Sequence, residues 1–597
     1  MRVWQPGGHL TMARGATVED WSWRRTVRRV STLARLAAPY RLRTGLALAS
    51  LAAATATGLA PPYLAKLALD EGIHNENFRL LVLVVVAFLV SGVLNLAASS
   101  AQTYFTGWTG ERILADLRNS LFRHLQRLSL GFFERNRAGV IISRITNDVE
   151  ALDQLVTDGV TTLFQSTLIL AGSAVILFVL DWRLALATLT VTPLMFAATA
   201  AFRIFSARAY RAVRERLGLV TATLAEDIAG IRVVQAFTRE RANEGNFRDV
   251  NASYRAANQR TVLTNGLYFP FVDFLSTAVV LGYGGWLYFH GQVSEGTLLA
   301  FLLYLSNFFD PVQQLSQLYN TFLSAVAALD KIMDVLDEEP ELRDRKGAVD
   351  LPRIDGHVRF EGVRFGYGDG PEVVHGLDLD VPAGTTVALV GHTGAGKSTI
   401  AKLLARFYDP REGRITIDGH DLRDVTQQSL RRQLGIVPQE GFLFAGTVHD
   451  NIAFGTAGAT REDVVRAAQV VGAHEFVERL EDGYDTELQE RGTRLSLGQR
   501  QLVAFARALL ADPRILVLDE ATSSVDIGTE RKIERALRQL LAERTAFIIA
   551  HRLSTIRDAD LIVVLEHGRV VEQGSHAELL ARRGLYTSLY GDWADVA

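Results

Sequence analysis

A glycine-rich segment at residues 391–399, Gly-His-Thr-Gly-Ala-Gly-Lys-Ser-Thr, has the residue types of a phosphate-binding loop. It follows a β-like run at residues 386–390 and precedes a segment at residues 400–406 that we expect to be helical. Glycines in such a loop let backbone N–H groups converge on phosphate oxygens at the N-terminus of a helix. We expect Lys397 to reach the β- and γ-phosphates of a nucleotide and Ser398 to ligate Mg²⁺.

Two adjacent carboxylates, Asp519 and Glu520, follow a continuous apolar run at residues 515–518. Such a run predicts a buried parallel strand, which would deliver both carboxylates to the carboxyl edge of its sheet. Hydrolysis of a nucleotide needs one acid in the Mg²⁺ shell and another that orients the attacking water. We therefore assign Asp519 to the metal and Glu520 to the water. Two plain surface acids are the alternative, which the phosphate loop disfavours.

The chain that must position these residues is long, apolar and almost neutral. It has 597 residues, of which 48% are hydrophobic, and a formal net charge of −3. This length predicts more than one domain, and the balanced charge argues against a general nucleic-acid binder. The chain contains no cysteine, which excludes disulfide scaffolds, thiol nucleophiles and cysteine-ligated metal sites.

Six long apolar segments occupy roughly the first 330 residues, and about 20 apolar residues suffice to cross a bilayer. Four of them contain no Asp, Glu, Lys or Arg, and two are interrupted by one acid each, Asp273 and Asp310. One buried helix of a soluble protein could explain one such run, but not six. We therefore predict six transmembrane spans, at residues 44–65, 80–110, 159–180, 184–202, 261–289 and 296–329.

The charges that flank these segments predict their orientation. Seven arginines lie between residues 24 and 43, whereas the first short loop carries Asp70, Glu71 and Glu76. Arginine-rich flanks stay in the cytoplasm, so six crossings place both termini there. We expect a multi-pass protein of the inner (plasma) membrane. Trp21 and Trp23 beside the arginines predict an interfacial helix rather than a secretory signal, with a solvated tail as the alternative.

Residues 495–499, Leu-Ser-Leu-Gly-Gln, lie between the phosphate loop and the carboxylate pair and resemble the signature of ATP-binding cassette (ABC) proteins. With six spans, long cytoplasmic gaps and a soluble α/β pattern from about residue 338, nearly the whole chain resembles a half-transporter of the ABC exporter family. The resemblance implies an α-helical six-span transmembrane domain with long cytoplasmic helical extensions, followed by an α/β P-loop NTPase domain. The implied parts are a cytoplasmic segment with an elbow helix (1–43), the transmembrane domain (44–335), a linker (336–356) and the nucleotide-binding domain (357–597).

The resemblance also assigns roles to residues that match the family's motifs in order. Tyr367 resembles the aromatic residue that stacks on adenine, Gln439 the glutamine that contacts Mg²⁺ and the attacking water, and His551 the switch histidine on the γ-phosphate. The expected catalytic residues are Glu520, His551 and Gln439. The expected Mg²⁺ ligands are Ser398, Gln439 and Asp519. The expected ATP contacts are Tyr367, Gly391, His392, Thr393, Gly394, Ala395, Gly396, Lys397, Ser398, Thr399, Ser496, Gly498 and Gln499.

Two stretches between the spans, residues 132–148 and 226–232, resemble the family's coupling regions, the second of which docks on the opposite subunit's cassette. The family's activity is ATP-driven export, or inner-to-outer flipping, of amphiphilic drugs, lipids or peptides by a dimer in the lipid membrane. Leu497 stands where the usual signature has Gly, which favours a heterodimer with this chain as the catalytically competent half. An importer with the exporter fold and an ATP-gated regulatory or channel subunit are the alternatives.

Asp310 lies near the middle of the last predicted span, and Asp273 lies nearer the cytoplasmic end of the fifth. Ionisable groups inside a bilayer are costly and usually functional. Both carboxylates could face a central cavity and favour cationic amphiphiles. The alternative is that Asp310-Pro311 marks a kink and that its carboxylate pairs locally.

Overall fold

The computed structural model describes residues 37–439, 441–489, 492, 494–519, 527–550 and 552–596. The chain folds into two compact units. The first comprises Met1–Gln126 and Gly139–Asp337, and the second comprises Arg127–Ala138 and Glu338–Ala597. The predicted interfacial helix with Trp21 and Trp23 lies outside the described residues.

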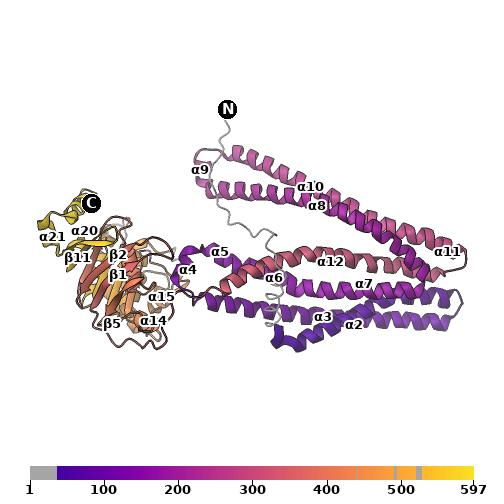
Figure 1. The fold of residues 1–597 in the computed structure, drawn as a ribbon, viewed down its shortest axis with the longest axis horizontal. Coiled ribbons are helices and arrows are strands. Elements are labelled where there is room, and N and C mark those ends of the chain that lie inside the picture. The colour runs from indigo at the N-terminus through magenta and orange to yellow at the C-terminus, as the bar shows by residue number, and fades with distance from the viewer. Residues whose placement is uncertain are drawn as a thin grey trace. The chain divides into compact units, whose positions relative to one another are not determined.

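The first unit is a set of long helices that run side by side (Figure 1). Each of the six apolar segments lies in helical backbone, and the two long gaps between them are mostly helical, as expected. Three stretches of the described residues are long and apolar enough to cross a membrane, namely Ala38–Ile73, Phe78–Leu125 and Ala138–Leu180. The main helices are α2 (Arg41–Leu67), α3 (Phe78–Leu125), α7 (Val160–Leu180), α8 (Trp182–Ala229), α9 (Ile231–Ala236), α10 (Glu240–Val279), α11 (Gly285–Phe289) and α12 (Glu295–Leu336).

Helix α2 contains two consecutive prolines, and α3 compensates for the first. Pro61 has no N–H, so the carbonyl oxygen of Thr57 loses its donor within the helix. The hydroxyl of Ser91, on α3, donates to that oxygen at 3.0 Å. One turn earlier, the side-chain amide of Asn95 donates to the carbonyl oxygen of Ala54 at 2.8 Å. Because lipid offers no hydrogen bonds, these contacts hold α2 against α3.

The start of α12 is held by a carboxylate from the turn after α2. Asp70 lies in the π-helical segment Ala68–Ile73. Its Oδ1 accepts from the backbone N–H of Gly296 at 2.8 Å, and its Oδ2 accepts from the hydroxyl of Ser294 at 2.6 Å. Ser294 itself caps α12 by accepting from the N–H of Thr297. Asp70 therefore supplies a second acceptor for the N-terminal donors of this helix.

The described part of the second unit contains two large sheets and a small two-stranded one, β7 (Gly446–Thr447) with β8 (Glu487–Leu488). A six-stranded sheet has the order β12-β11-β3-β10-β9-β6, in which only β12 is antiparallel to its neighbour, and an antiparallel sheet has the order β2-β1-β4-β5. The strands of the two large sheets are β1 (Val358–Phe365), β2 (Val374–Val381), β3 (Thr386–Val390), β4 (Glu412–Ile417), β5 (His420–Asp421), β6 (Leu434–Val437), β9 (Ile515–Asp519), β10 (Thr545–Ile549), β11 (Leu561–Glu566) and β12 (Arg569–Gly574).

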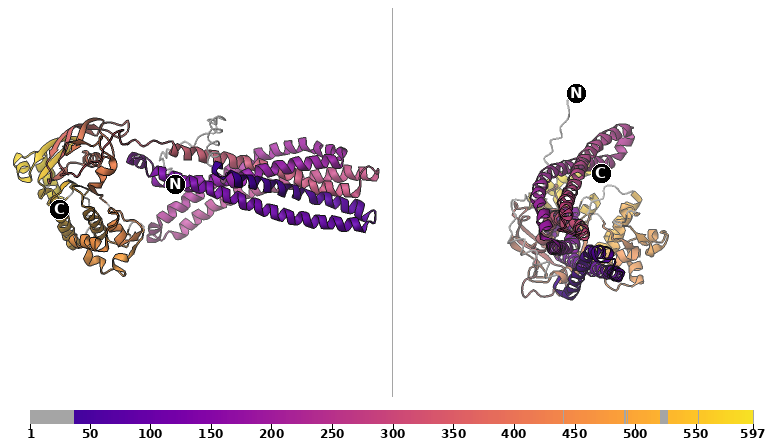
Figure 2. Two further views of the ribbon diagram at one scale, coloured as in Figure 1. Left: turned by 90° about the horizontal axis from the view of Figure 1, so that it is seen from below. Right: turned by 90° about the vertical axis from the view of Figure 1, so that its right-hand side faces the viewer.

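Two apolar cores stabilise this unit. Side chains of the antiparallel sheet, such as Phe360, meet side chains of the six-stranded sheet, such as Phe547. Side chains on the other face of the six-stranded sheet pack against helices that include α16 (Arg461–Val470) and α18 (Leu497–Leu510). Figure 2 (left) shows the strands gathered in one lobe of this unit and the orange helices in another. The apolar run at residues 515–518, predicted as a buried strand, is buried on both faces, because both cores use its side chains.

Candidate nucleotide-binding site

The predicted phosphate loop connects β3 to α13 (Lys397–Leu404), which is the strand, loop and helix order expected. The backbone is left-handed at Gly394 (φ +87°) and at Gly396 (φ +102°), which precedes the helix. Glycine adopts these angles without strain. The loop therefore wraps the N-terminus of α13, where unpaired N–H groups favour an anion.

Lys397 is folded back onto this loop. Its side chain is buried, and its Nζ donates to the carbonyl oxygens of Gly391 at 2.6 Å and His392 at 3.1 Å. Burial lowers the pKa of Lys397 below its usual value, and the nearby Asp519 carboxylate only partly opposes this effect. A buried ammonium gains from a phosphate group that replaces the lost water.

The strand order brings the other predicted groups to the same edge of the sheet. The loop follows β3, Asp519 ends β9, and Gln439 follows β6, so all three leave carboxyl ends of parallel strands. Together they line one cavity of about 240 Å³. Its lining residues are Val373, Thr393, Gly394, Gly396, Lys397, Ser398, Thr399, Gln439, Asp519 and Ile549. Gly391, His392 and Ala395 belong to the same loop but do not line the cavity.

The donor set of this cavity fits Mg²⁺. Ser398, Gln439 and Asp519 offer a hydroxyl, an amide oxygen and a carboxylate, which are hard oxygen ligands. Among the residues that the structure describes, no group of three His, Asp or Glu side chains could hold a metal by itself. Mg²⁺ is typically held by one or two carboxylates together with substrate phosphates, so this cavity suits a metal that arrives with a nucleotide.

Two of the three predicted catalytic residues, Glu520 and His551, lie outside the described residues. The signature residues are described. Ser496 caps α18, where its hydroxyl accepts from the N–H of Gln499, while the Gln499 side chain accepts from the N–H of Ser496. Ser496, Gly498 and Gln499 do not line the cavity that holds the phosphate loop. The signature is therefore formed as a capped helix N-terminus but does not complete this chain's own site.

Tyr367 follows β1 and is half-buried. It does not line the cavity itself, but its hydroxyl lies 3.0 Å from Oγ1 of Thr399, which does. Val373 and Ile549 line the cavity although sequence reasoning did not select them. Ile549 is the last residue of β10, between the two strands that carry the loop and Asp519, so its position at a strand end was the available signal.

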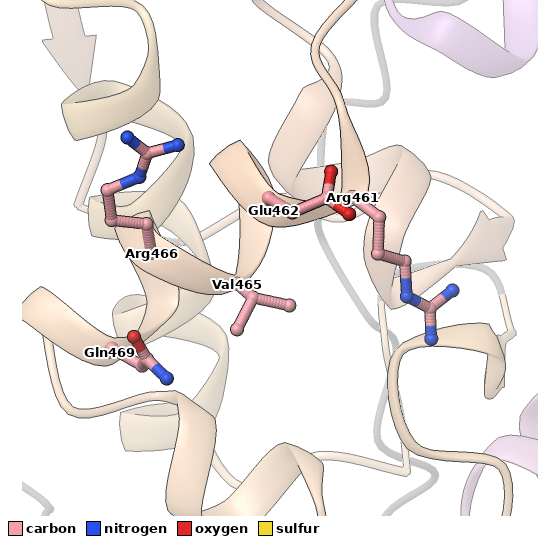
Figure 3. Close-up of a pocket in the computed structure, with 5 residues that line it drawn as sticks. All are labelled: Arg461, Glu462, Val465, Arg466 and Gln469. Atoms are coloured by element: carbon pink, nitrogen blue, oxygen red, sulfur yellow. The ribbon is translucent and has the colours of Figure 1, made fainter.

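A second, larger hollow lies on the surface of α16 (Figure 3) and has a volume of about 450 Å³. It is lined by Arg461, Glu462, Val465, Arg466 and Gln469. Both arginines already have carboxylate partners, because Arg461 donates to Asp485 at 2.6 Å and Arg466 to Asp463 at 2.7 Å. Their side chains also point in different directions in Figure 3. This hollow is therefore a weaker candidate for a phosphate site than the cavity at the loop.

Comparisons with known proteins agree with this architecture. Residues 44–312 match the family model described as "ABC transporter transmembrane region", and residues 374–523 match the model described as "ABC transporter". A solved "bacterial Atm1-family ABC exporter with ATP bound" is similar to the chain, with a TM-score of 0.75 and 33% sequence identity, over 93% of this chain and 98% of that one.

Two of three similar relatives match over most of their own length, and the third over about half of it. The uncharacterized ABC transporter ATP-binding protein YknV of Bacillus subtilis (strain 168) is 44% identical over 87% of each chain. An ATP-dependent lipid A-core flippase of Syntrophus aciditrophicus is 40% identical over 94% of this chain and 93% of its own. A multidrug efflux ATP-binding/permease protein of Mycobacterium bovis is 39% identical over 94% of this chain and 47% of its own. The chain therefore belongs to the ABC transporters, as an exporter-type half-transporter in which a helical membrane region is fused to a cassette that couples ATP hydrolysis to transport.

Proposed function

We propose that this half-transporter uses ATP to export amphiphilic compounds, such as drugs, lipids or peptides, or to flip them from the inner to the outer leaflet. The observation that carries the proposal is the cavity in which the phosphate loop, Gln439 and Asp519 meet, in a chain that also carries a helical membrane region. The similarity to a lipid A-core flippase and to a multidrug efflux protein supports the class of substrate.

The residues of the site have distinct roles in hydrolysis. Lys397 and the loop N–H groups would bind the β- and γ-phosphates. Ser398, Gln439 and Asp519 would hold Mg²⁺, which neutralises charge on the phosphate oxygens when it is bound. Glu520 and Gln439 would orient the attacking water, and His551 would contact the γ-phosphate. Phosphoryl transfer depends mainly on positioning and electrostatics, which these residues supply.

The active form requires a second subunit. ABC exporters act as dimers, and the cavity of this chain lacks its own Ser496, Gly498 and Gln499, so a partner's signature would close over the nucleotide. The second coupling region carries apolar side chains at its surface, because Ile228 and Ile231 are exposed. Such residues suit docking on a partner's cassette. ATP would drive closure because it contacts both subunits only in the closed pair.

We further propose that both termini face the cytoplasm and that the division into residues 1–43, 44–335, 336–356 and 357–597 describes the functional parts. The basic residues before the first span support this orientation. The membrane-embedded acids would favour cationic substrates. Asp310 carries this part of the proposal, since nothing is described of the Asp273 side chain. We expect Asp310→Asn to reduce transport of a cationic dye relative to a neutral one, and an unchanged ratio would contradict the assignment.

The test of the main function is ATP turnover and transport in sealed lipid vesicles. We expect amphiphiles to stimulate turnover and to accumulate inside inside-out vesicles, whereas accumulation in the opposite direction would support an importer. Glu520→Gln is the control, and we expect it to bind ATP but to lose turnover by roughly 100-fold or more, since it removes the group that orients the water. ATP hydrolysis without movement of any substrate would instead favour a regulatory or channel subunit.

A further inference from the structure

A short helix from the membrane half of the sequence belongs to the compact unit of the cassette. Helix α4 (Leu130–Arg135) lies in the segment Arg127–Ala138, which folds with residues 338–597. Its Glu134 uses both carboxylate oxygens. Oε1 accepts from Nζ of Lys402 at 2.8 Å, and Oε2 accepts from the hydroxyl of Tyr408 at 2.7 Å. Glu134 lies 268 residues from Lys402 in sequence, so this is a tertiary contact rather than a local one.

Lys402 also touches the residue proposed to stack on adenine. It lies on α13, the helix that begins at the phosphate loop, and its Nζ lies 5.5 Å from the ring centroid of Tyr367. The Tyr367 hydroxyl in turn pairs with Thr399 at 3.0 Å, and its ring meets the ring of Tyr408 edge-on at 5.2 Å. An unbroken series of contacts therefore runs from Glu134 through Lys402 to Tyr367 and ends in the phosphate loop.

Both ends of the Glu134–Lys402 pair are held in their charged forms. Burial raises the pKa of Glu134, but the hydrogen bonds from Lys402 and Tyr408 outweigh it, and the pKa lies below its usual value. Burial lowers the pKa of Lys402, but the hydrogen bond to Glu134 and the electrostatic attraction of Tyr367 and Glu134 together outweigh it, and the pKa lies above its usual value. The ammonium is therefore present at neutral pH and is attracted by the face of the Tyr367 ring.

We propose that Glu134 and Lys402 are positioning residues that link the docking of α4 to the binding of the nucleotide base at Tyr367. The inference rests on the proposed nucleotide site. Glu134 holds the Lys402 ammonium against the Tyr367 ring, and this contact fixes the orientation in which the ring can stack on a base. Linkage makes the effect reciprocal, so a bound base strengthens the docking of α4 by the same factor. Binding of the adenine base would then be coupled, through the Lys402 ammonium, to a helix from the membrane half of the sequence.

A second ion pair allows the positioning of Tyr367 to be tested separately from the docking of α4. Arg135, also on α4, lies 2.6 Å from Glu341, and neither side chain contacts Tyr367 in the part of the chain that the structure describes. Glu341→Gln therefore weakens the attachment of the same helix but leaves the Glu134–Lys402 and Lys402–Tyr367 contacts in place. It is the matched control for Glu134→Gln.

The experiment measures dissociation constants of the full chain in the Glu520→Gln background, for ATP and for inorganic tripolyphosphate, which has no base. We expect Glu134→Gln and Lys402→Met each to weaken ATP binding by roughly 3-fold to 10-fold. The double variant should bind ATP no more weakly than Lys402→Met does. Lys402→Arg should keep an ATP dissociation constant within about 2-fold of the parent's. Tripolyphosphate binding should change by less than about 2-fold in all of them, as should ATP binding in Glu341→Gln.

Three results would overturn the inference: unchanged ATP binding in Glu134→Gln and Lys402→Met, equal losses for ATP and tripolyphosphate, or the same loss in Glu341→Gln. If Glu134→Gln does not fold, the comparison of Lys402→Met with Lys402→Arg still decides between these outcomes. A parent chain that fails to bind ATP contradicts the proposed nucleotide site itself. If the parent chain binds ATP and the variants bind it equally well, only the link through Lys402 is contradicted.

Discussion

Gly391 and Gly394 need glycine for different physical reasons. Both have positive φ angles, +149° and +87°. A Cβ added to Gly391 would collide with the carbonyl oxygen of Leu565 on the neighbouring strand β11, whereas a Cβ added to Gly394 would meet nothing within 4 Å. Backbone of a paired strand cannot move aside cheaply, so the first substitution forces the loop itself to shift.

We predict that Gly391→Ala destabilises the cassette by about 2 kcal/mol or more, from the clash, and that Gly394→Ala costs about 1 kcal/mol, from left-handed strain alone. Thermal unfolding of the detergent-solubilised chain without nucleotide measures the difference. A smaller loss in Gly391→Ala than in Gly394→Ala would contradict the loop geometry described above.

At this scale the sequence predicted that the loop and Asp519 lie at the sheet edge, because glycines before a helix and acids at the end of an apolar run are local patterns. Gln439, which lines the same cavity, was selected only through the family resemblance. The sequence did not predict Lys402 as a partner of Glu134. Glu134 lay in a recognised motif, but no local pattern encodes a contact across 268 residues. Val373 was also missed, because in sequence an apolar residue at a cavity wall cannot be told from an ordinary core residue.

Among the helices, the contact of Asp70 with the start of α12 makes the clearest prediction. Asp70→Ala removes the acceptor for the Gly296 N–H and the Ser294 hydroxyl. Loss of a capping acceptor typically costs about 1 kcal/mol, and an unsatisfied donor adds to it, so we expect a loss of about 1–2 kcal/mol. The measurement is the melting temperature of the chain in detergent.

Glu71→Ala is the matched control, because Glu71 is exposed and lies in the same turn. We expect its melting temperature to stay close to that of the unchanged chain. Equal decreases in melting temperature in the two variants would show that the charge of the turn stabilises the chain, rather than the cap on α12.

Sequence periodicity predicted these elements, whereas the docking of residues 132–148 on a cassette was expected only from the family resemblance. The apolar runs lie in helices, and the β-like runs lie in strands, because burial in lipid or in a sheet leaves a local pattern. The same pattern cannot tell which unit a short helix joins. Helix α4 has six residues and belongs to the cassette unit through Glu134 and Arg135, whose partners lie far along the chain.

For the whole molecule, the decisive feature is that the signature residues do not line the cavity of the phosphate loop. The loop and Asp519 share a cavity, while the capped N-terminus of α18 lies apart from it. In a dimer, this chain's signature would serve its partner's phosphate loop. Leu497 is the first residue of α18 and stands where the usual signature has Gly. A side chain there hinders the close approach of backbone to phosphate that glycine permits.

A self-dimer would carry Leu497 in both of its sites, whereas a heterodimer would carry it in one. We therefore predict that the chain purified alone turns over ATP slowly and that Leu497→Gly raises this rate by roughly 10-fold or more, the effect of one restored phosphate contact of about 1.4 kcal/mol. Adding Glu520→Gln to Leu497→Gly should abolish the gain, which assigns it to this chain's own site. A stable self-dimer with robust turnover that Leu497→Gly leaves unchanged would contradict the heterodimer, because the leucine would then be compatible with two working sites.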